Sequence, residues 1–496
     1  MAYHYIGGMR DQLFLMPTSM RDWLVEGHLA WFVIEVVEHI DTTMLHLRHP
    51  NDGPGRPAYD PDMMLTLLLY AYMTGRRSSR AIEAACRTDA AYRVICGDVV
   101  PDHATIARFL VNHQDAIEGV FVEVLRLCSA AGLVSVGTVA IDGTKIGSDA
   151  ALDRNRSAGW IRGQVAAILA EAVETDQAEN ELPGLLAVDE LPEQLSTATG
   201  RLARLNEALA VIEAQDAAAA VQAEQRTTKA RDAAAQGRKL RGRKPKDPHA
   251  ALARAETDET AVRVKATAKH TSDADIAAAV EADPRVLEAV AATATARERA
   301  AAAATTVTKA NVTDPDSRIM KTQTGWVQGY NAQAAVNEHQ IILAHHVSQD
   351  ANDIGLYQPM VDATLRTLEQ AGVTDPIGTV LADAGYWSHD NATVEGPDRL
   401  IATLKDHKQR RAAVELGTTQ GDPPEDATTA EAMEHRLRTP EGAATYAKRS
   451  HTVEPVFSLK ANWGYHRFRR RGLGPARSEW ALIAAAHNLG KLHRTT

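Results

Sequence analysis

Cysteines, long apolar runs and net positive charge are scarce or missing in this chain of 496 residues. The three cysteines, Cys86, Cys96 and Cys128, form no CxxC pair, which argues against a thiol-based metal site or a disulfide framework. No apolar run reaches the ~18 residues that a membrane-spanning helix needs. The first residues also lack the apolar core of a signal peptide. We therefore expect a cytoplasmic protein that does not enter a membrane.

The formal net charge of −10 does not suggest a protein that coats nucleic acid, because such proteins are usually basic. The charge is unevenly distributed, however, and a charged partner responds to the local field. Lys and Arg gather in residues 226–246 and 446–496, whereas Asp and Glu gather in 171–191, 213–224 and 254–285. The two basic stretches are therefore candidate surfaces for an anionic partner.

The length predicts about two to four domains, at the usual ~100–200 residues each. Residues 20–130 carry apolar side chains at helical spacing. Gly75 ends one predicted helix, Ser78 or Ser79 can cap the next, and Pro101 precedes a third. Short helices joined by tight turns outline a helix-turn-helix, which would bind DNA, but a plain helical bundle has the same pattern.

From residue 134 onwards the pattern becomes that of a mixed α/β domain. Residues 134–146 are rich in β-branched side chains and predict a strand. Further strands are predicted within 325–348, at 377–387 and at 399–405, with a helix at about 354–371 and a helical C-terminus. Without the Ala-rich segment 160–310, which predicts helical hairpins or a coiled coil, this order is close to that of an RNase H-like domain.

Two aspartates occupy matching positions after predicted strands. Asp142 ends an apolar, β-branched stretch and precedes Gly143, and Asp383 follows Val380–Ala382 shortly before Gly385. If the two strands are neighbours, the carboxylates meet and repel each other unless divalent cations neutralise them. Oxygen ligands favour Mg²⁺ or Mn²⁺ over zinc, and such a pair of ions supports phosphoryl transfer. The alternative is that each aspartate is an ordinary turn residue.

A third acid can come from the basic C-terminal stretch. Glu454 lies there among residues that could hold phosphates, which are Tyr446, Arg449, Lys460, Arg467, Arg469, Arg470 and Arg471. Pro455 suggests that a helix begins near Glu454, because proline is tolerated in the first turn. A charged helix of this kind is also compatible with a solvated surface without any function.

The chain resembles the DDE transposases of bacterial insertion sequences, in stretches distributed over its whole length. The matching stretches are HLAWFV (28–33), RPAYDP (56–61), SSRAIE (78–83), VPDHATIARF (100–109), AIDGTKI (140–146), RGRKPK (241–246), TDPDSRIMKT (313–322), VQGYNAQAAV (327–336), LADAGYWS (381–388), VEPVFSLK (453–460) and SEWALIAAAHNLGKL (478–492). The resemblance implies an RNase H-like catalytic core, with Asp142, Asp383 and Glu454 as a triad that binds Mg²⁺ or Mn²⁺.

The expected fold is thus an α/β RNase H-like core with an all-α N-terminal domain and a long helical insertion. We expect a helical DNA-binding domain at 1–130 and the first part of the core at 131–155. The insertion spans 156–312 and contains the basic loop 226–246. The rest of the core, with basic C-terminal helices, occupies 313–496.

The third acid departs from the pattern of related families. These carry Tyr, two residues, Arg, three residues, Glu, six residues and Lys, whereas the intervals here are two, four and five residues. Glu454 is therefore one place late, and Glu479 is the alternative, although the apolar residues after it indicate a packing helix. His466 and His487 could form a metal site with Glu479, but isolated histidines are more often ordinary surface or core residues.

The insertion also contains a candidate DNA contact. Arg241, Arg243 and Lys244 lie in RGRKPK, which resembles a hook that places Arg side chains in a narrow minor groove. The usual hook does not have a lysine between the second arginine and the proline. A solvated loop that attracts phosphates generically is the other interpretation.

The expected function is DNA strand cleavage and strand transfer at the inverted-repeat ends of an insertion sequence. The partners would be double-stranded DNA of the element ends and the target, bound by a homodimer associated with the bacterial nucleoid. The alternative is a catalytically inactive or repurposed DNA-binding protein derived from a transposase. All three candidate acids are present and no strand of the core is missing from the pattern, which favours the active enzyme.

Overall fold

The computed structural model describes residues 19–47, 58–179, 198–239, 245, 247–270, 275–302, 307–322, 324–404, 411, 414–458 and 464–495. Contacts within the chain divide it into two compact units, one formed by Met1–Arg154 and Asp316–Thr496, the other by Asn155–Pro315. The second unit is therefore an insertion between the two halves of the first. Among the described residues, no helix is long and apolar enough to cross a membrane.

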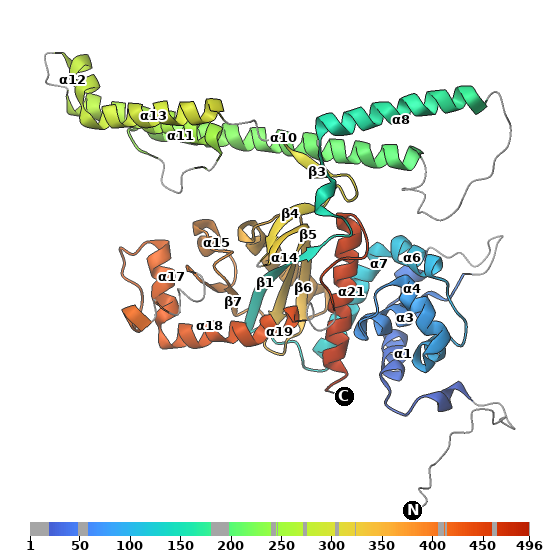
Figure 1. The fold of residues 1–496 in the computed structure, drawn as a ribbon. Coiled ribbons are helices and arrows are strands. Elements are labelled where there is room, and N and C mark those ends of the chain that lie inside the picture. Colours follow the sequence, from blue (N-terminus) through green and yellow to red (C-terminus); the bar gives the residue numbers. More distant parts are fainter. Residues whose placement is uncertain are drawn as a thin grey trace, which may run out of the picture. The chain divides into compact units, whose positions relative to one another are not determined.

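The N-terminal part of the first unit is helical, as the sequence predicts (Figure 1). Its elements are η1 (Met20–Trp23), α1 (Leu29–His39), α2 (Thr43–His46), α3 (Pro61–Met73), α4 (Ser79–Thr88), α5 (Ala90–Ile95), α6 (His103–Asn112) and α7 (Gln114–Ala130). Helix α3 ends just before Gly75, where φ is +77°, as expected. The expected serine cap of α4 is not formed, because Ser78 stands at the N-cap without a side-chain hydrogen bond.

A mixed sheet forms the other part of this unit. Its strands are β1 (Thr138–Gly147), β4 (Arg318–Thr322), β5 (Gly325–Asn337), β6 (Ile342–Ser348), β7 (Thr379–Ala382) and β8 (Asp398–Ile401). The strand order is β4-β5-β1-β7-β8, and β6 also pairs with β5. The β1–β5, β4–β5 and β5–β6 pairs are antiparallel, whereas β1–β7 and β7–β8 are parallel. The predicted α/β class is confirmed, and β4 is an additional strand that we did not predict.

Helices cover the sheet and join it to the N-terminal part. They are η3 (Ile354–Leu356), α14 (Tyr357–Gln370), α15 (His389–Thr393), α17 (Thr429–Arg438), α18 (Pro440–Thr452), α19 (Glu454–Phe457) and α21 (Leu473–Leu492). Helix α14 contacts β5 and β6, α18 contacts β1 and β7, and α21 contacts β6, α3 and α7 (Figure 1). The sheet and the N-terminal helices consequently share one hydrophobic core, which fixes the ends of the strands relative to α18 and α21.

The inserted unit is built from long helices, as the Ala-rich sequence predicts. It contains β2 (Asn155–Ser157), α8 (Ala158–Glu179), α10 (Ala198–Ala235), α11 (Pro248–Lys269), α12 (Ile276–Ala282), α13 (Pro284–Ala302) and β3 (Lys309–Asn311), and β2 pairs with β3. Ile161 of α8 packs with Leu205 and Ile212 of α10, and Val262 of α11 packs with Val286 of α13. The helical spacing of apolar residues in 161–168 and 202–212 therefore marks a real packing seam.

Candidate active site

Asp142 and Asp383 lie on neighbouring parallel strands. The β1–β7 pairing ends at Ile141 and Ala382. Asp142 is the next residue of β1, and Asp383 is the first residue after β7. The two are close enough for the Asp383 charge to raise the pKa of Asp142. We predicted that Asp142 would end its strand, and this is wrong, because β1 continues to pair with β5 as far as Gly147. The sequence-predicted pair is nevertheless brought together.

The turn after β7 holds Asp383 in place. Its Oδ1 accepts a hydrogen bond of 2.8 Å from the backbone N–H of Gly385, and its backbone carbonyl accepts one of 3.1 Å from Tyr386. A Cβ at Gly385 would lie 2.9 Å from Oδ1 of Asp383 and 3.3 Å from Oδ2 of Asp353. The turn therefore places a third carboxylate, that of Asp353, beside Asp383.

Asp353 is a site residue that our sequence reasoning missed. It follows β6 in the polar stretch Gln349–Asp353, which has the composition of an ordinary loop. A signal was available in the strand directions, because β6 is antiparallel to β5, which is antiparallel to β1. Strand β6 thus runs in the same direction as β1 and β7, and a polar residue that follows it emerges at the same end of the sheet.

The pKa of Asp142 is raised from its ordinary value to about 7, mainly by burial and in smaller part by the charges of Asp383 and Asp353. Arg449 and the backbone N–H of Gly143 act in the opposite direction. The N–H of Gly143 donates to Asp142 Oδ1 over 2.7 Å. Arg449 thus offsets part of the negative charge around Asp142, while Lys145 pairs with Asp353 over 3.0 Å.

Arg449 of α18 links Asp142 to Glu454. Its guanidinium donates to Asp142 Oδ2 over 2.6 Å and lies 3.7 Å from Glu454 Oε1. The Arg449 side chain is only 6% exposed, whereas that of Glu454 is 54% exposed. Helix α19 begins at Glu454 with Pro455 in its first turn, as predicted. Glu454 thus stands at the solvent edge of the acids, with Arg449 between it and Asp142.

The alternative third acid, Glu479, is in a different setting. Its side chain is fully buried in α21, where Oε1 pairs with Arg77 over 3.2 Å and Oε2 accepts the backbone N–H of Arg469 over 2.8 Å. The conceivable cluster of His466, Glu479 and His487 is also not formed, since His487 instead contacts the carbonyl of Gln340 over 2.8 Å. Glu479 has the structural role that its apolar surroundings in the sequence indicated.

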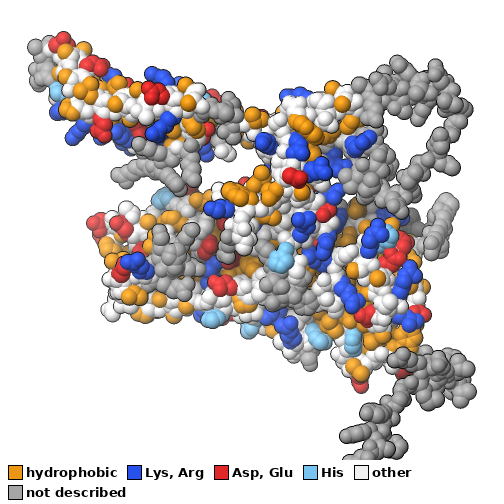
Figure 2. All heavy atoms as spheres, viewed as in Figure 1, with side chains coloured by type: hydrophobic (Ala, Val, Ile, Leu, Met, Phe, Trp, Pro, Cys, Tyr) orange, Lys and Arg blue, Asp and Glu red, His pale blue; other side chains and the backbone are white. Residues whose placement is uncertain are grey.

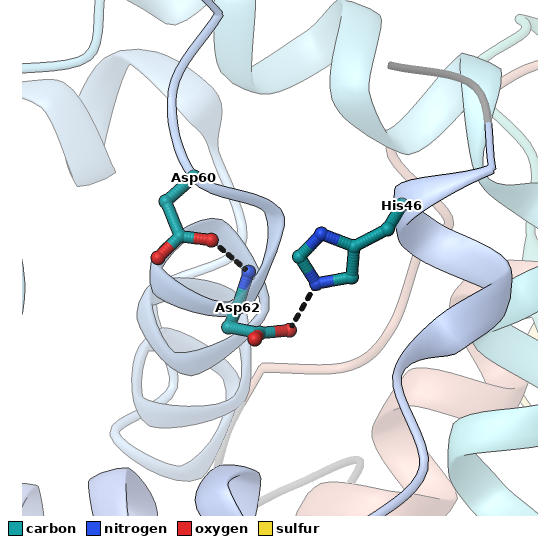
Figure 3. Close-up of side chains that lie close together, drawn as sticks. All are labelled: His46, Asp60 and Asp62. Atoms are coloured by element: carbon teal, nitrogen blue, oxygen red, sulfur yellow. Dashed lines mark hydrogen bonds and ion pairs between the residues drawn. The ribbon is translucent and has the colours of Figure 1, made fainter. Parts of the chain in front are cut away.

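Among the described residues, one group of three side chains has ligand atoms all within 4.8 Å of one another, and it is formed by His46, Asp60 and Asp62 (Figure 3). Ordinary interactions explain this group. Asp60 caps α3 through the backbone N–H of Asp62, and Asp62 pairs with His46 over 3.0 Å. We therefore attach no catalytic role to it.

The predicted DNA contacts have different surroundings. Arg467, Arg469 and Arg471 are exposed, and both Arg467 and Arg471 pair with Asp149, over 4.0 and 3.0 Å. Arg470 is half-buried near Glu479, and burial lowers its pKa. Tyr446 packs against the core. Four of the predicted contacts lie outside the described residues, namely Lys460, Arg241, Arg243 and Lys244. In the described part of the insertion, α11 and α13 carry basic and acidic side chains intermixed on the face seen in Figure 2.

Comparison with known families identifies two parts of the chain. Residues 19–112 match a transposase domain (DUF772), and residues 399–493 match a transposase DDE domain. Neither a curated protein nor a solved structure matched. The first match covers the N-terminal helices from η1 to α6, and the second includes Tyr446, Arg449 and Glu454. The two matches confirm the resemblance of the chain to insertion-sequence DDE transposases.

Proposed function

We propose that this transposase is an active, metal-dependent enzyme that cleaves DNA strands at the inverted-repeat ends of an insertion sequence and joins them to a target. The observation that carries the proposal is the meeting of Asp142 and Asp383 where the pairing of the parallel strands β1 and β7 ends. Glu454, in the part of the chain that matches a transposase DDE domain, is joined to Asp142 through Arg449.

We also assign the sheet to the RNase H-like class. Leaving out β4, the strands lie in the order β6-β5-β1-β7-β8, which by chain order is 3-2-1-4-5. Strand β5 is antiparallel to both β1 and β6, whereas β7 and β8 are parallel to β1. The insertion follows β1 and leaves this order intact. This topology supports the RNase H-like assignment that the sequence resemblance implied.

The donor set at the acids fits a hard divalent cation. Asp142, Asp383 and Glu454 offer only carboxylate oxygens, which suit Mg²⁺ or Mn²⁺, and burial together with like charge makes ionised Asp142 costly in the metal-free protein. We propose that these three residues hold the ions. When bound, such ions supply a Lewis acid and a means of activating water or a 3′-hydroxyl. Asp142 and Asp383 are fixed by the sheet and its turn, so their positions are set before DNA arrives.

The exposed arginines would hold the DNA. Arg467, Arg469 and Arg471 are available for phosphates, and the pairs of Arg467 and Arg471 with Asp149 are solvent-exposed and therefore weak. Arg470 is a poorer candidate than the sequence suggested, because it is half-buried. Tyr446, Arg449 and Lys460 remain proposed contacts, as do Arg241, Arg243 and Lys244 of the insertion. Two element ends must be held together for strand transfer, so we propose a dimer on DNA.

The test is single-turnover cleavage of terminal-repeat DNA in the presence of Mg²⁺. Glu454→Gln keeps the shape of the side chain and removes its charge, so we expect cleavage to be lost while DNA binding is unchanged or slightly tighter. Glu441→Gln is the matched control, since Glu441 is an exposed acid in the first turn of α18. If Glu454→Gln cleaves DNA at a rate within about tenfold of the wild-type rate, Glu454 does not belong to the triad. A wild-type protein that binds DNA without cleaving it would favour the repurposed protein.

A further inference from the structure

The carboxylate of Asp353 is the meeting point of a buried polar network. Three donors converge on its Oδ1, which are Lys145 Nζ at 3.0 Å, Asn331 Nδ2 at 2.7 Å and Gln333 Nε2 at 2.9 Å. Asn331 and Gln333 are fully buried on β5, and the Asp353 side chain is 26% exposed. Asn331 Nδ2 also donates to the carbonyl of Asp350 over 3.1 Å, and Gln333 Nε2 to Oδ1 of Asn331 over 2.9 Å. Asp353 therefore completes the hydrogen bonding of two buried amides, which are costly without partners.

The network continues to the turn that carries Asp383. The hydroxyl of Tyr386 donates to Oε1 of Gln333, so that Gln333 connects Asp353 to Tyr386. Tyr386 is fully buried, and its backbone N–H donates to the carbonyl of Asp383 over 3.1 Å. A continuous path therefore runs from the Asp353 carboxylate through Gln333 and Tyr386 to the backbone of Asp383.

The sheet is adapted to this network at Gly143. A Cβ on Gly143 would overlap the side-chain amide of Gln333 and approach Oδ1 of Asn331 to 3.0 Å. Gly143 follows Asp142 on β1 and is the register partner of Gln333 on β5. The glycine that follows the first acid, Asp142, thus leaves the space that the amide groups of the network occupy.

We propose that Asp353 is a positioning residue for the acids, acting on Asp383 through Gln333 and Tyr386. The inference rests on the proposed function, because it assigns Asp353 a task in the same site. Acceptors that orient ligand side chains commonly affect metal affinity or activity by about 10–100-fold. A carboxylate suits this task better than a neutral acceptor, because one of its three donors is the Lys145 cation.

The test measures Mn²⁺ affinity of the full-length protein by electron paramagnetic resonance, together with single-turnover cleavage. Asp353→Ala should weaken Mn²⁺ binding and slow cleavage by about tenfold or more, with binding of terminal-repeat DNA unchanged. Tyr386→Phe removes the hydroxyl that donates a hydrogen bond to Gln333, and it should also weaken Mn²⁺ binding and slow cleavage. The double variant should lose less than the product of the two single effects, since residues of one network are not additive. Asp350→Ala is the matched control in the same loop, because the Asp350 side chain contacts Ser348, and the backbone carbonyl that accepts from Asn331 is kept in the variant.

The outcomes separate this inference from the proposed function. If Asp353→Ala lowers only the melting temperature and leaves Mn²⁺ affinity and cleavage within about twofold, Asp353 is merely structural and the inference is wrong. The same conclusion follows if the effects of Asp353→Ala and Tyr386→Phe simply multiply. Should Asp353→Ala fail to fold, the same comparison of single and double variants can be made with Asp353→Asn and Tyr386→Phe. A wild-type protein that neither binds Mn²⁺ nor cleaves DNA contradicts the proposed function and the inference together.

Discussion

The buried pair of Arg77 and Glu479 offers a direct test of what anchors the C-terminal basic segment. Arg77 precedes α4, Glu479 lies on α21, and their side chains are 3% and 0% exposed. Arg77 also donates to the carbonyls of Arg467 and Gly464 over 2.9 and 2.7 Å and stacks on Tyr465 at 4.4 Å. The two residues thus connect the N-terminal helices, α21 and the segment that leads into the exposed arginines.

Arg77→Met should therefore be strongly destabilising. Removing one partner of a buried ion pair costs about 3–5 kcal/mol, because the other charge is left without compensation. The two lost carbonyl contacts add little, since Gly464 and Arg467 are exposed and water can replace the donor. We expect the free energy of unfolding at pH 7 to fall by about 3–5 kcal/mol, measured by urea denaturation with tryptophan fluorescence, to which buried Trp480 beside Glu479 contributes.

The effect should depend on pH in a defined direction. Burial raises the pKa of Glu479, while Arg77, Arg470 and the backbone N–H of Arg469 lower it. Without Arg77 the folded-state pKa rises further above the unfolded value of about 4.3. A group of this kind favours folding below its unfolded pKa and loses that contribution as pH rises through the folded pKa. The destabilisation of Arg77→Met should therefore shrink as the pH is lowered towards 4.5.

The double variant Arg77→Met, Glu479→Gln is the control for charge. It leaves neither charge of the Arg77–Glu479 pair behind, so it should be more stable at pH 7 than Arg77→Met alone. A loss below about 1 kcal/mol for Arg77→Met, which is within the range of surface pairs, would refute the reasoning. So would a double variant in which the two single losses simply add.

Three further predictions concern the site and its DNA contacts. Replacing Arg467, Arg469 and Arg471 together by Ala should weaken binding to all DNA sequences alike and reduce the salt slope by about 1 per lost phosphate contact; unchanged binding of non-specific DNA would place them off the DNA path. Gly143→Ala should cost about 1–3 kcal/mol by displacing Gln333 and weaken Mn²⁺ binding, whereas Gly137→Ala, with open space at its Cβ, should do neither. Arg449→Met should tighten Mn²⁺ binding without DNA by about tenfold, or ~1.4 kcal/mol, yet slow cleavage; weaker Mn²⁺ binding would contradict competition between Arg449 and the cation.

Local patterns predicted the elements, and the partners of buried charges could not be predicted from them. The β-branched stretch before Asp142 and the apolar residues before Asp383 are strands because their side chains suit a covered sheet. Pro455 located the start of α19 at Glu454. The partner of Glu479, in contrast, is Arg77, about 400 positions away, and no spacing rule connects two residues so distant.

The sequence was least informative where one side chain depends on several others. Strand β4 has no strong apolar pattern and exists because it pairs with the first residues of β5. Asp353 lies in a stretch typical of loops, and the role proposed for it rests on three donors from two strands. Asp142 was expected at the end of its strand, but β5 is long enough to extend β1 by five residues. In each case the missing information is the identity of a neighbour across the sheet.

We propose that Arg449 connects the candidate chemistry to the DNA. In the structure its guanidinium lies between Asp142 and Glu454, so it supplies locally the positive charge that divalent cations would otherwise provide. A guanidinium suits phosphate oxygens as well as it suits carboxylates. If cations take over Asp142 and Glu454, Arg449 becomes available to a phosphate of the same DNA strand. Metal binding and DNA binding would then support each other, because each removes the competitor of the other.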